Sequence, residues 1–533
     1  MFPSKTESLQ KDTPGAHDPW ITRVRPKMTP PSLKDNTADA ERLVKGLKTV
    51  LHEQNVVIAL PLFNRLNSIL RENHFRVDAV LFETGQTWHL IDILPPSENR
   101  PLYGLSLDLG TSTVVLQLHD LAGKTTLDEI SFLNPQIDIG PDILTRIQSA
   151  SEEGGLQNLR KKLIEEINRA IGRLSVSRGM TTDTIVGMSV AGNTTMTHFF
   201  LGLNPYWICR EPYIPVVNKP GILRAEELGL AIHPRAPVMV FPNVGSYFGG
   251  DLIAGILASG MTQQEGVSML VDVGTNAEVV LGNREWIMGC AGAAGPALEG
   301  GVAKMGMMAG PGAIDRVRID PVSGDLTIRT IGGGRPIGIC GSGLIDLVAQ
   351  LYLAGIIDLR GKLVANSCGE RLKEIDGIRY YVVAFSQESG TGKDLTLSQP
   401  DIDSLVRSKA AMYTILRTIT RMVPISFQNI QRFYIAGTFG AYIDPRSAIT
   451  VGMIPDLPLE RYRSLGNTCL DGATKALLSR KSRDEVDRIR DGITYVELNV
   501  NQEFMNLFSA AKFIPHTDTF LFPSVKGQVG DIT

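Results

Sequence analysis

Two segments of the chain combine the residue types that a polyphosphate site needs. In the first, an apolar strand is followed by Asp108, Gly110, Thr111, Ser112 and Thr113 and then by a second apolar run. In the second, 164 residues further on, the same order is repeated with Asp272, Gly274, Thr275 and Asn276. Each pattern predicts a β-hairpin whose turn exposes backbone N–H groups and hydroxyls. One copy is a common strand–turn sequence, but two matching copies indicate a nucleotide site.

The residue types in these turns suit phosphate and magnesium. Glycine lets the backbone approach a phosphate closely, and successive N–H groups can hold phosphate oxygens. Carboxylates repel phosphate but suit Mg²⁺ through its bound waters, so Asp108 and Asp272 are predicted to be catalytic and metal-binding. Glu299 is a third catalytic candidate, because it follows a Gly-Pro-Ala-Leu turn and precedes two glycines. As a carboxylate at a helix start, it could equally complement the helix dipole.

A third glycine turn follows a strand near residue 432. Gly437, Thr438, Phe439 and Gly440 form a turn that lets the backbone pack flat against adenine or ribose, although it could be a generic strand–loop turn. This order of two phosphate loops and an adenosine turn resembles the superfamily of actin, sugar and acetate kinases and heat-shock chaperones. That resemblance implies two related lobes that close on ATP. Gly192, Asn193 and Thr194 match the superfamily's first connecting segment, in which a strand runs into a helix.

Hydrophobic periodicity predicts the elements that position these turns. Residues 1–40 lack periodicity and predict a mobile tail, whereas residues 41–100 predict a small α/β domain with strands over 76–82 and 87–94. Beyond residue 100, glycine-rich turns alternate with β-branched and helical stretches, which is typical of an α/β fold. Helices are predicted over 155–178, 341–354 and 399–422. With the resemblance, the expected fold is an actin-like ATPase of two ribonuclease-H-like subdomains, lobe 1 over 101–265 and lobe 2 over 266–533.

Composition excludes several other classes. The 533 residues are 43% hydrophobic and 20% charged, as in soluble globular proteins, and the net charge of −3 gives no reason to expect a nucleic-acid partner. No apolar run approaches the roughly 20 residues that span a bilayer, and the first residues do not resemble a signal peptide. We therefore expect a cytoplasmic protein without a membrane partner. The five cysteines form no C-x-x-C pair, which argues against a disulfide framework or a four-cysteine metal site.

Longer motifs narrow the family. They include Asn134-Pro-Gln136, the segments 140–146, 294–300, 338–346, 409–411, 436–440 and 452–456, and Tyr495-Val-Glu497. As a set they resemble the ATPase domain of the reductive activators of corrinoid proteins, over about residues 41–515. The resemblance implies that MgATP drives the reduction of cob(II)alamin to cob(I)alamin on a corrinoid methyl-transfer protein. By position, it assigns both hairpin turns to the phosphates and Gly437, Thr438 and Gly440 to the adenosine.

The family resemblance also raises Gly341, Ser342 and Gly343, which open a helix nearby. Their N–H groups and the positive helix end could face the nucleotide, or the glycines could serve tight packing of the helix start against a strand. Both interpretations stay open.

The cysteine positions depart from the family pattern. Many corrinoid activators carry an N-terminal plant-type [2Fe–2S] domain, whereas the first 208 residues here contain no cysteine. We therefore expect this domain and any iron–sulfur cluster to be absent, and a separate ferredoxin-like protein to supply the electron.

Three alternatives share the fold. Activators of 2-hydroxyacyl-CoA dehydratases bridge a [4Fe–4S] cluster between subunits. Cys290 is a passable local match to their cysteine turn, with Cys340 as the only obvious second ligand, although Cys290 could equally be a small residue in a Gly/Ala-rich turn. A small-molecule kinase would need a general base in the cleft, for which Asp251, Glu299 and Asp346 are the candidates. A non-catalytic scaffold would have degraded phosphate loops, and both loops are intact. The sequence is compatible with a homodimer.

Overall fold

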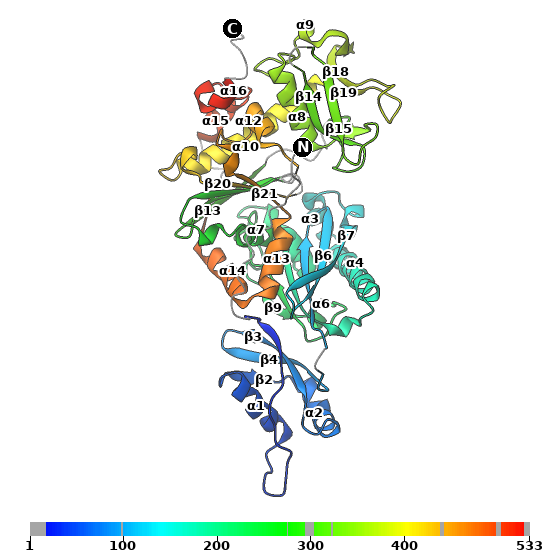
Figure 1. Cartoon of the computed structure of the whole chain (residues 1–533), viewed down its shortest axis with the longest axis vertical. Coiled ribbons are helices and arrows are strands. Elements are labelled where there is room, and N and C mark those ends of the chain that lie inside the picture. The colour runs from blue at the N-terminus through cyan, green and yellow to red at the C-terminus, as the bar shows by residue number, and fades with distance from the viewer. Residues whose placement is uncertain are drawn as a thin grey trace. The chain divides into compact units, whose positions relative to one another are not determined.

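The computed structural model describes residues 18–97, 100–273, 276–293, 303–320, 323–437, 442–496 and 503–526. The chain divides into two compact units. Unit 1 contains Met1–Leu257 and Cys469–Arg490, and unit 2 contains Ala258–Thr468 and Asp491–Thr533. Within the described ranges, no helix has the length and apolar character of a membrane span. Helices and strands alternate in both units, which confirms the α/β class (Figure 1).

A small α/β domain begins unit 1. Its sheet has the order β1-β3-β4-β2, and the long hairpin of β3 and β4 pairs Asp78 with Leu94 and Thr84 with Thr87. The apolar faces of α1 and α2 pack on this sheet and form one buried cluster with it. The elements are β1 (Ile21–Val24), α1 (Asp39–Val50), β2 (Asn55–Val57), α2 (Leu60–Glu72), β3 (Asp78–Thr84) and β4 (Thr87–Leu94).

The start of this domain differs from the mobile tail that the sequence predicts for residues 1–40. Residues 21–24 form β1, which pairs antiparallel with β3 at the edge of the sheet. Trp20 precedes the strand, is fully buried, and donates its indole N–H toward the carbonyls of Ala476 and Leu477 at 3.0 and 2.8 Å. Partners more than 50 residues away stabilise this strand, so local periodicity could not reveal it.

A six-stranded sheet forms the centre of the rest of unit 1. Its order is β7-β6-β5-β8-β10-β9, in which β5, β6 and β7 are antiparallel neighbours and β8 and β10 continue parallel to β5. The strands are β5 (Tyr103–Leu109), β6 (Thr113–Asp120), β7 (Thr125–Leu133), β8 (Ile185–Gly192), β9 (Gly221–Arg224) and β10 (Pro237–Val240). The helices are α3 (Ile143–Ala150), α4 (Gly155–Ser177), α5 (Thr194–Leu201), α6 (Ala225–Leu228) and α7 (Gly250–Ser259).

The sheet of unit 2 repeats this topology. Its order is β21-β20-β11-β12-β13-β22, with β11, β12 and β13 antiparallel and β20 and β21 parallel to β11. Three antiparallel strands followed by two parallel ones occur in both units, which confirms two ribonuclease-H-like subdomains. The strands are β11 (Ser268–Val273), β12 (Asn276–Gly282), β13 (Ile287–Ala293), β20 (Arg432–Ala436), β21 (Tyr462–Gly466) and β22 (Ile493–Val496).

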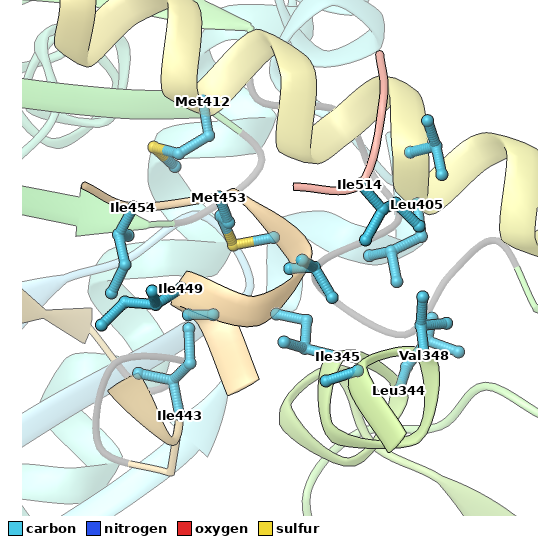
Figure 2. Packing of buried hydrophobic residues seen from close by; sticks show 14 of the residues in the cluster. Leu344, Ile345, Val348, Leu405, Met412, Ile443, Ile449, Met453, Ile454 and Ile514 are labelled. Atoms are coloured by element: carbon cyan, nitrogen blue, oxygen red, sulfur yellow. The ribbon is translucent and has the colours of Figure 1, made fainter. Parts of the chain in front are cut away.

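Helices α8, α10 and α12 meet in the core of unit 2. Figure 2 shows Ile345 and Val348 of α8 near Ile449 of α12 and Leu405 of α10, within one buried cluster. Burying such a side chain contributes about 2 kcal/mol, so this cluster is a large part of the unit's stability. The helices are α8 (Gly341–Leu353), α9 (Ala365–Cys368), α10 (Gln399–Arg421), α12 (Pro445–Val451), α15 (Glu503–Ala511) and α16 (Pro523–Lys526). The starts of α4, α8 and α10 confirm the predicted helices.

Two small sheets complete unit 2. One has the order β15-β14-β16 and the other β17-β18-β19. Their strands are β14 (Ala313–Ile319), β15 (Leu326–Thr330), β16 (Gly338–Ile339), β17 (Leu372–Ile375), β18 (Ile378–Ala384) and β19 (Leu395–Ser398).

The segment 469–490 belongs to unit 1, although we expected all residues beyond 265 in lobe 2. It contains most of α13 (Thr468–Leu478) and α14 (Arg480–Gly492). A Cβ on Gly472 would lie 2.1 Å from the carbonyl oxygen of Ala254, so α13 packs backbone to backbone against α7. Arg480 binds Asp18 and Glu83, each at 2.8 Å. The chain therefore leaves unit 2 at residue 468 and returns at 491.

A buried polar network joins α13 to the first predicted phosphate hairpin. The hydroxyl of Ser106, on β5, lies 2.8 Å from both His119 Nε2 and Thr474 Oγ1. The other ring nitrogen of His119 lies 3.2 Å from the hydroxyl of Thr126. His119 is fully buried, and its burial lowers its pKa to about 4. The ring is therefore neutral at pH 7, with one nitrogen donating and the other accepting.

This network predicts a loss of stability in mild acid. The unfolded chain takes up a proton at His119 below its ordinary pKa of about 6.5, whereas the folded chain resists protonation down to about 4. The free energy of unfolding should therefore fall by roughly 3 kcal/mol from this residue as the pH drops from 6.5 to 4. Denaturant unfolding curves at pH 7.5 and 4.5 measure it. His119→Gln should remove this part of the pH dependence, whereas the exposed His52→Gln should keep it.

Candidate functional site

The turn between β5 and β6 is held from behind by two side chains. Asn134 Nδ2 donates to the carbonyl of Gly110 at 3.0 Å, and Arg146 Nη1 donates to the carbonyl of Thr111 at 2.9 Å. The N–H of Asn134 donates to the carbonyl of Ser112 at 2.9 Å. Three successive carbonyls of the turn therefore point toward the protein interior.

This arrangement directs N–H groups of the turn to the opposite side. In a trans peptide the C=O and N–H of one plane point in opposite directions. The N–H groups of Thr111 and Ser112 therefore point away from Asn134 and Arg146. Among the described residues, neither N–H has a hydrogen-bond acceptor. Unsatisfied neighbouring N–H groups form a concave site for an anion, and the Ser112 side chain beside them is exposed.

Glycine is required at the start of this turn. A Cβ on Gly110 would lie 2.2 Å from the carbonyl oxygen of Thr113, a distance that no real contact allows. Asp108 lies two residues before it near the end of β5, opposite Val115 and beside Ala191 of β8. Asp108 is half-buried, whereas its neighbours Leu107 and Leu109 are buried, and it lies where the turn begins.

The turn that follows β8 meets the first hairpin turn. Asn193 caps α5 by accepting from the N–H of Met196 at 2.9 Å, and its Nδ2 donates to Thr111 Oγ1 at 3.0 Å. A Cβ on Gly192 would lie 2.8 Å from the carbonyl oxygen of Leu109, so glycine permits this close approach. The structure thus brings Gly192 and Asn193 together with Gly110 and Thr111, which the sequence placed in one site.

Two further segments line this part of unit 1. Thr194 Oγ1 donates to the carbonyl of Gly245 at 3.0 Å. A Cβ on Gly249 would lie 2.5 Å from Asn193 Cα and 2.7 Å from Asp251 Oδ1, so the loop before α7 packs against the start of α5. The sequence analysis named Thr194 and Asp251 as candidates but gave no role to Gly245 and Gly249. The only feature of the sequence that could have pointed to these two glycines is the high glycine content around them.

In unit 2, Asp272 lies next to Gly437, the first residue of the turn predicted to face adenosine. It pairs with Glu278 of β12 on one side and with Ala436 of β20 on the other. Gly437 has φ +81°, and a Cβ there would lie 2.8 Å from Asp272 Oδ1. The structure therefore brings Asp272 and Gly437 together. Gly274, Thr275, Glu299, Thr438, Phe439, Gly440 and the side chain of Asn276 lie outside the described residues.

The start of α8 is tightly packed. Gly341, Ser342 and Gly343 are all buried, and a Cβ on Gly343 would lie 2.1 Å from the carbonyl oxygen of Ile314. Cys340 caps this turn with its N–H on the same carbonyl at 3.1 Å. The close packing of α8 against β14 therefore requires glycine at position 343. A role of these residues at the nucleotide stays a prediction.

The kinase and cluster candidates have structural partners. Asp346 is buried and accepts from the N–H of Val317 at 2.6 Å and the hydroxyl of Ser447 at 2.5 Å. Burial raises its pKa, and the Asp346 carboxyl ties α8 to β14 and α12. Cys290 is fully buried on β13, and burial raises its pKa to about 12. Among the described residues, no group of three or more histidine, cysteine or acidic side chains could hold a metal ion.

Sequence reasoning gave no individual role to the residues behind the first turn. Asn134 and Arg146 occur in family motifs, but each binds a main-chain carbonyl of the turn. Such a contact requires no particular sequence pattern, so it could not be predicted. Arg146 is fully buried on α3, which Asp142 caps by accepting from the N–H of Thr145 at 2.9 Å. Burial lowers the pKa of the Arg146 guanidinium, which still stays charged at pH 7.

Family models match three consecutive stretches of the chain. The RACo linker region matches residues 10–100, the RACo middle region matches residues 103–264, and the C-terminal domain of RACo, the ASKHA domain, matches residues 266–526. Together they span the small domain and both ribonuclease-H-like subdomains.

Two characterised relatives and one solved structure agree with these matches. The corrinoid activation enzyme RamQ of Eubacterium limosum is 31% identical over 428 residues, which are 79% of this chain and 72% of RamQ. A Co(II) methylated amine-specific corrinoid protein reductase of Methanosarcina barkeri is 24% identical over 445 residues, or 76% of each chain. The structure of a reductive activator for corrinoid, iron–sulfur protein has a TM-score of 0.86 and 39% identity, and the match covers 96% of this chain and 82% of that one.

Proposed function

This chain belongs to the RACo family of reductive activators of corrinoid proteins, and we propose that it uses ATP to return a corrinoid protein to its reduced state. The observation that carries the proposal is the turn after β5. Its carbonyls are bound from behind, and the N–H groups of Thr111 and Ser112 are available to an anion. The triphosphate of ATP is the anion that this fold family binds.

In this proposal, separate residues bind the phosphate oxygens and the magnesium ion. Thr111 and Ser112 donate N–H groups to phosphate oxygens, and Asn193 holds the Thr111 hydroxyl in place. Asp108 and, in the matching hairpin of unit 2, Asp272 are assigned to Mg²⁺ through its waters. Bound Mg²⁺ would neutralise phosphate charge. The carboxylates fit that ion because both lie half-buried at the end of a buried strand.

Hydrolysis requires that water attack the γ-phosphorus while the bond to the ADP oxygen breaks. The proton of the attacking water leaves with inorganic phosphate. We assign the orientation of that water to Asp108 or Asp272, because a carboxylate can accept its hydrogen bond. The resulting change between ATP and ADP at the turn would then be transmitted to the corrinoid protein.

The proposal also needs an electron donor. Reduction of cob(II)alamin to cob(I)alamin takes up one electron, and ATP hydrolysis supplies none. We propose that a separate ferredoxin-like protein supplies this electron and that the corrinoid protein is the substrate.

The test combines ATP hydrolysis with cobalt reduction. The protein is mixed anaerobically with a cob(II)alamin-bearing methyl-transfer protein, MgATP and a one-electron reductant. We expect phosphate release to be stimulated by the corrinoid protein and cob(I)alamin absorbance to grow only with ATP. If a small metabolite stimulates the reaction and becomes phosphorylated instead, the chain is a kinase and the proposal fails.

A second prediction concerns the thiols. Cys290 is fully buried on β13, and among the described residues it belongs to no group of three or more histidine, cysteine or acidic side chains that could hold a metal ion. Anaerobically purified protein should contain no stoichiometric iron. Cys290→Ala and Cys340→Ala should hydrolyse ATP at rates within about twofold of the wild type, which is less than 1 kcal/mol of barrier. Iron that is bound by the wild type and lost in Cys290→Ala would instead support a cluster.

A further inference from the structure

Arg146 occupies an unusual position behind the first turn. Its side chain is fully buried, with Nε on the carbonyl of Gly140 at 2.8 Å and Nη1 on the carbonyl of Thr111 at 2.9 Å. Nη1 also lies 3.6 Å from the sulfur of Met196 on α5. One guanidinium thus connects α3, the hairpin turn and α5.

The bond to Thr111 sets the direction of one peptide plane. Because this plane is trans, holding its carbonyl on Arg146 directs the N–H of Ser112 toward the opposite side. Asn134 does the same for the preceding plane through Gly110, so the N–H of Thr111 follows. Without Arg146 the plane between residues 111 and 112 could rotate, and the two N–H groups would no longer point together.

The charge of Arg146 has no direct ion-pair partner among the described residues. Asp142, which caps α3, acts on it electrostatically but forms no ion pair with it, and Nη2 of Arg146 is buried without a hydrogen-bond partner in the described chain. Burying an unpaired cation is costly, and guanidinium groups are usually paired when buried. An anion bound on the far side of the turn would add a second opposite charge, one peptide plane away from the guanidinium.

We infer that Arg146 is a positioning residue for the phosphates of ATP: it holds the turn so that its N–H groups face one side, and it places a buried positive charge behind them. The inference rests on the proposed function, because it takes ATP as the ligand of this turn. It gives Arg146 no contact with the nucleotide. The expected signature is weaker binding of the phosphate groups without weaker binding of the nucleoside.

The test compares Arg146 with a matched arginine in the same unit. Arg160 also donates to two main-chain carbonyls, those of Phe200 at 3.2 Å and Leu228 at 3.0 Å. Equilibrium binding of MgATP and competition by adenosine are measured on the full chain. Arg146→Met should raise the Kd for MgATP by about tenfold or more, since charge-assisted hydrogen bonds are strong. It should leave the Kd for adenosine within about twofold, and Arg160→Met should change neither beyond that.

The lysine variant separates charge from geometry. Arg146→Lys keeps the cation but loses the planar fork, so its Kd for MgATP should fall between those of the wild type and Arg146→Met. A lysine variant as weak as the methionine variant would overturn the role of the charge. If Arg146→Met does not fold, Arg146→Lys is compared with Arg160→Lys by the same two ligands.

Two other outcomes are decisive. A folded Arg146→Met that binds MgATP as the wild type does, or that loses adenosine and MgATP equally, overturns the positioning role while the proposed function stands. A wild-type protein that does not bind MgATP contradicts the proposed function itself, and the inference with it. Thermal unfolding of each variant shows that the comparison concerns folded protein.

Discussion

Replacing Asp108 by asparagine is expected to lower kcat for ATP hydrolysis by about 100-fold or more, because a group that acts on developing charge contributes that much. The amide has the same shape but no charge, so the hairpin should keep its fold. MgATP binding should weaken much less, since the N–H groups of Thr111 and Ser112 are unchanged. Steady-state phosphate release and equilibrium binding separate the two effects. Asp272→Asn should behave in the same way.

The control for this prediction is Asp120, at the opposite end of the same hairpin. Its carboxylate accepts from the N–H of Ala122 at 3.0 Å, which an asparagine oxygen can also do. Asp120→Asn should hydrolyse ATP within about twofold of the wild type. An Asp108→Asn protein with wild-type kcat would show that this carboxylate has no part in hydrolysis.

Replacing Gly110 by alanine should weaken MgATP binding by about ten- to a hundredfold, because forced backbone strain costs about 1–3 kcal/mol. The new methyl group would lie 2.2 Å from the carbonyl oxygen of Thr113, which belongs to the backbone and cannot rotate away. The turn must therefore open, and the N–H groups must lose their common direction. Binding of MgATP by titration calorimetry measures the loss.

The matched control is Gly172, within α4. A Cβ there meets nothing within 4 Å, so the same substitution adds only a methyl group on a helix. Gly172→Ala should stabilise the protein by about 0.5–1 kcal/mol and leave MgATP binding unchanged. If Gly110→Ala also binds MgATP normally, the turn after β5 is not the phosphate site.

Much of the fold could be predicted because its signals are local. An apolar run, an aspartate and a glycine turn specify each hairpin within about 15 residues, and α4 and α10 show helical periodicity over their whole length. Strand β1 could not be predicted, since it consists of four residues between prolines and is stabilised by partners far along the chain, among them β3 and the residues that bind Trp20. The placement of 469–490 in unit 1 depends on packing against Ala254, which no local pattern encodes.

The candidate site divides in the same way. Residues that would touch phosphate, such as Gly110 and Thr111, were predicted because the turn chemistry requires their types. Asn134 and Arg146 have an indirect role, since each binds a carbonyl of the turn rather than the phosphate. Any side chain with a donor of suitable reach could do so from elsewhere in the sequence. Such support can be recognised only after folding has brought it behind the turn.

The path of the chain through α13 and α14 has a practical consequence for dissecting this protein. The natural cut by sequence family falls near residue 265, between the middle region and the ASKHA domain. A piece that ended there would lack Thr474 and Gly472, and with them the partner of the Ser106–His119 pair and the cover of α7. The stretches matched by the family models therefore do not coincide with the compact units of the folded chain. We expect the first 264 residues to stay soluble only when 469–490 is fused back to them.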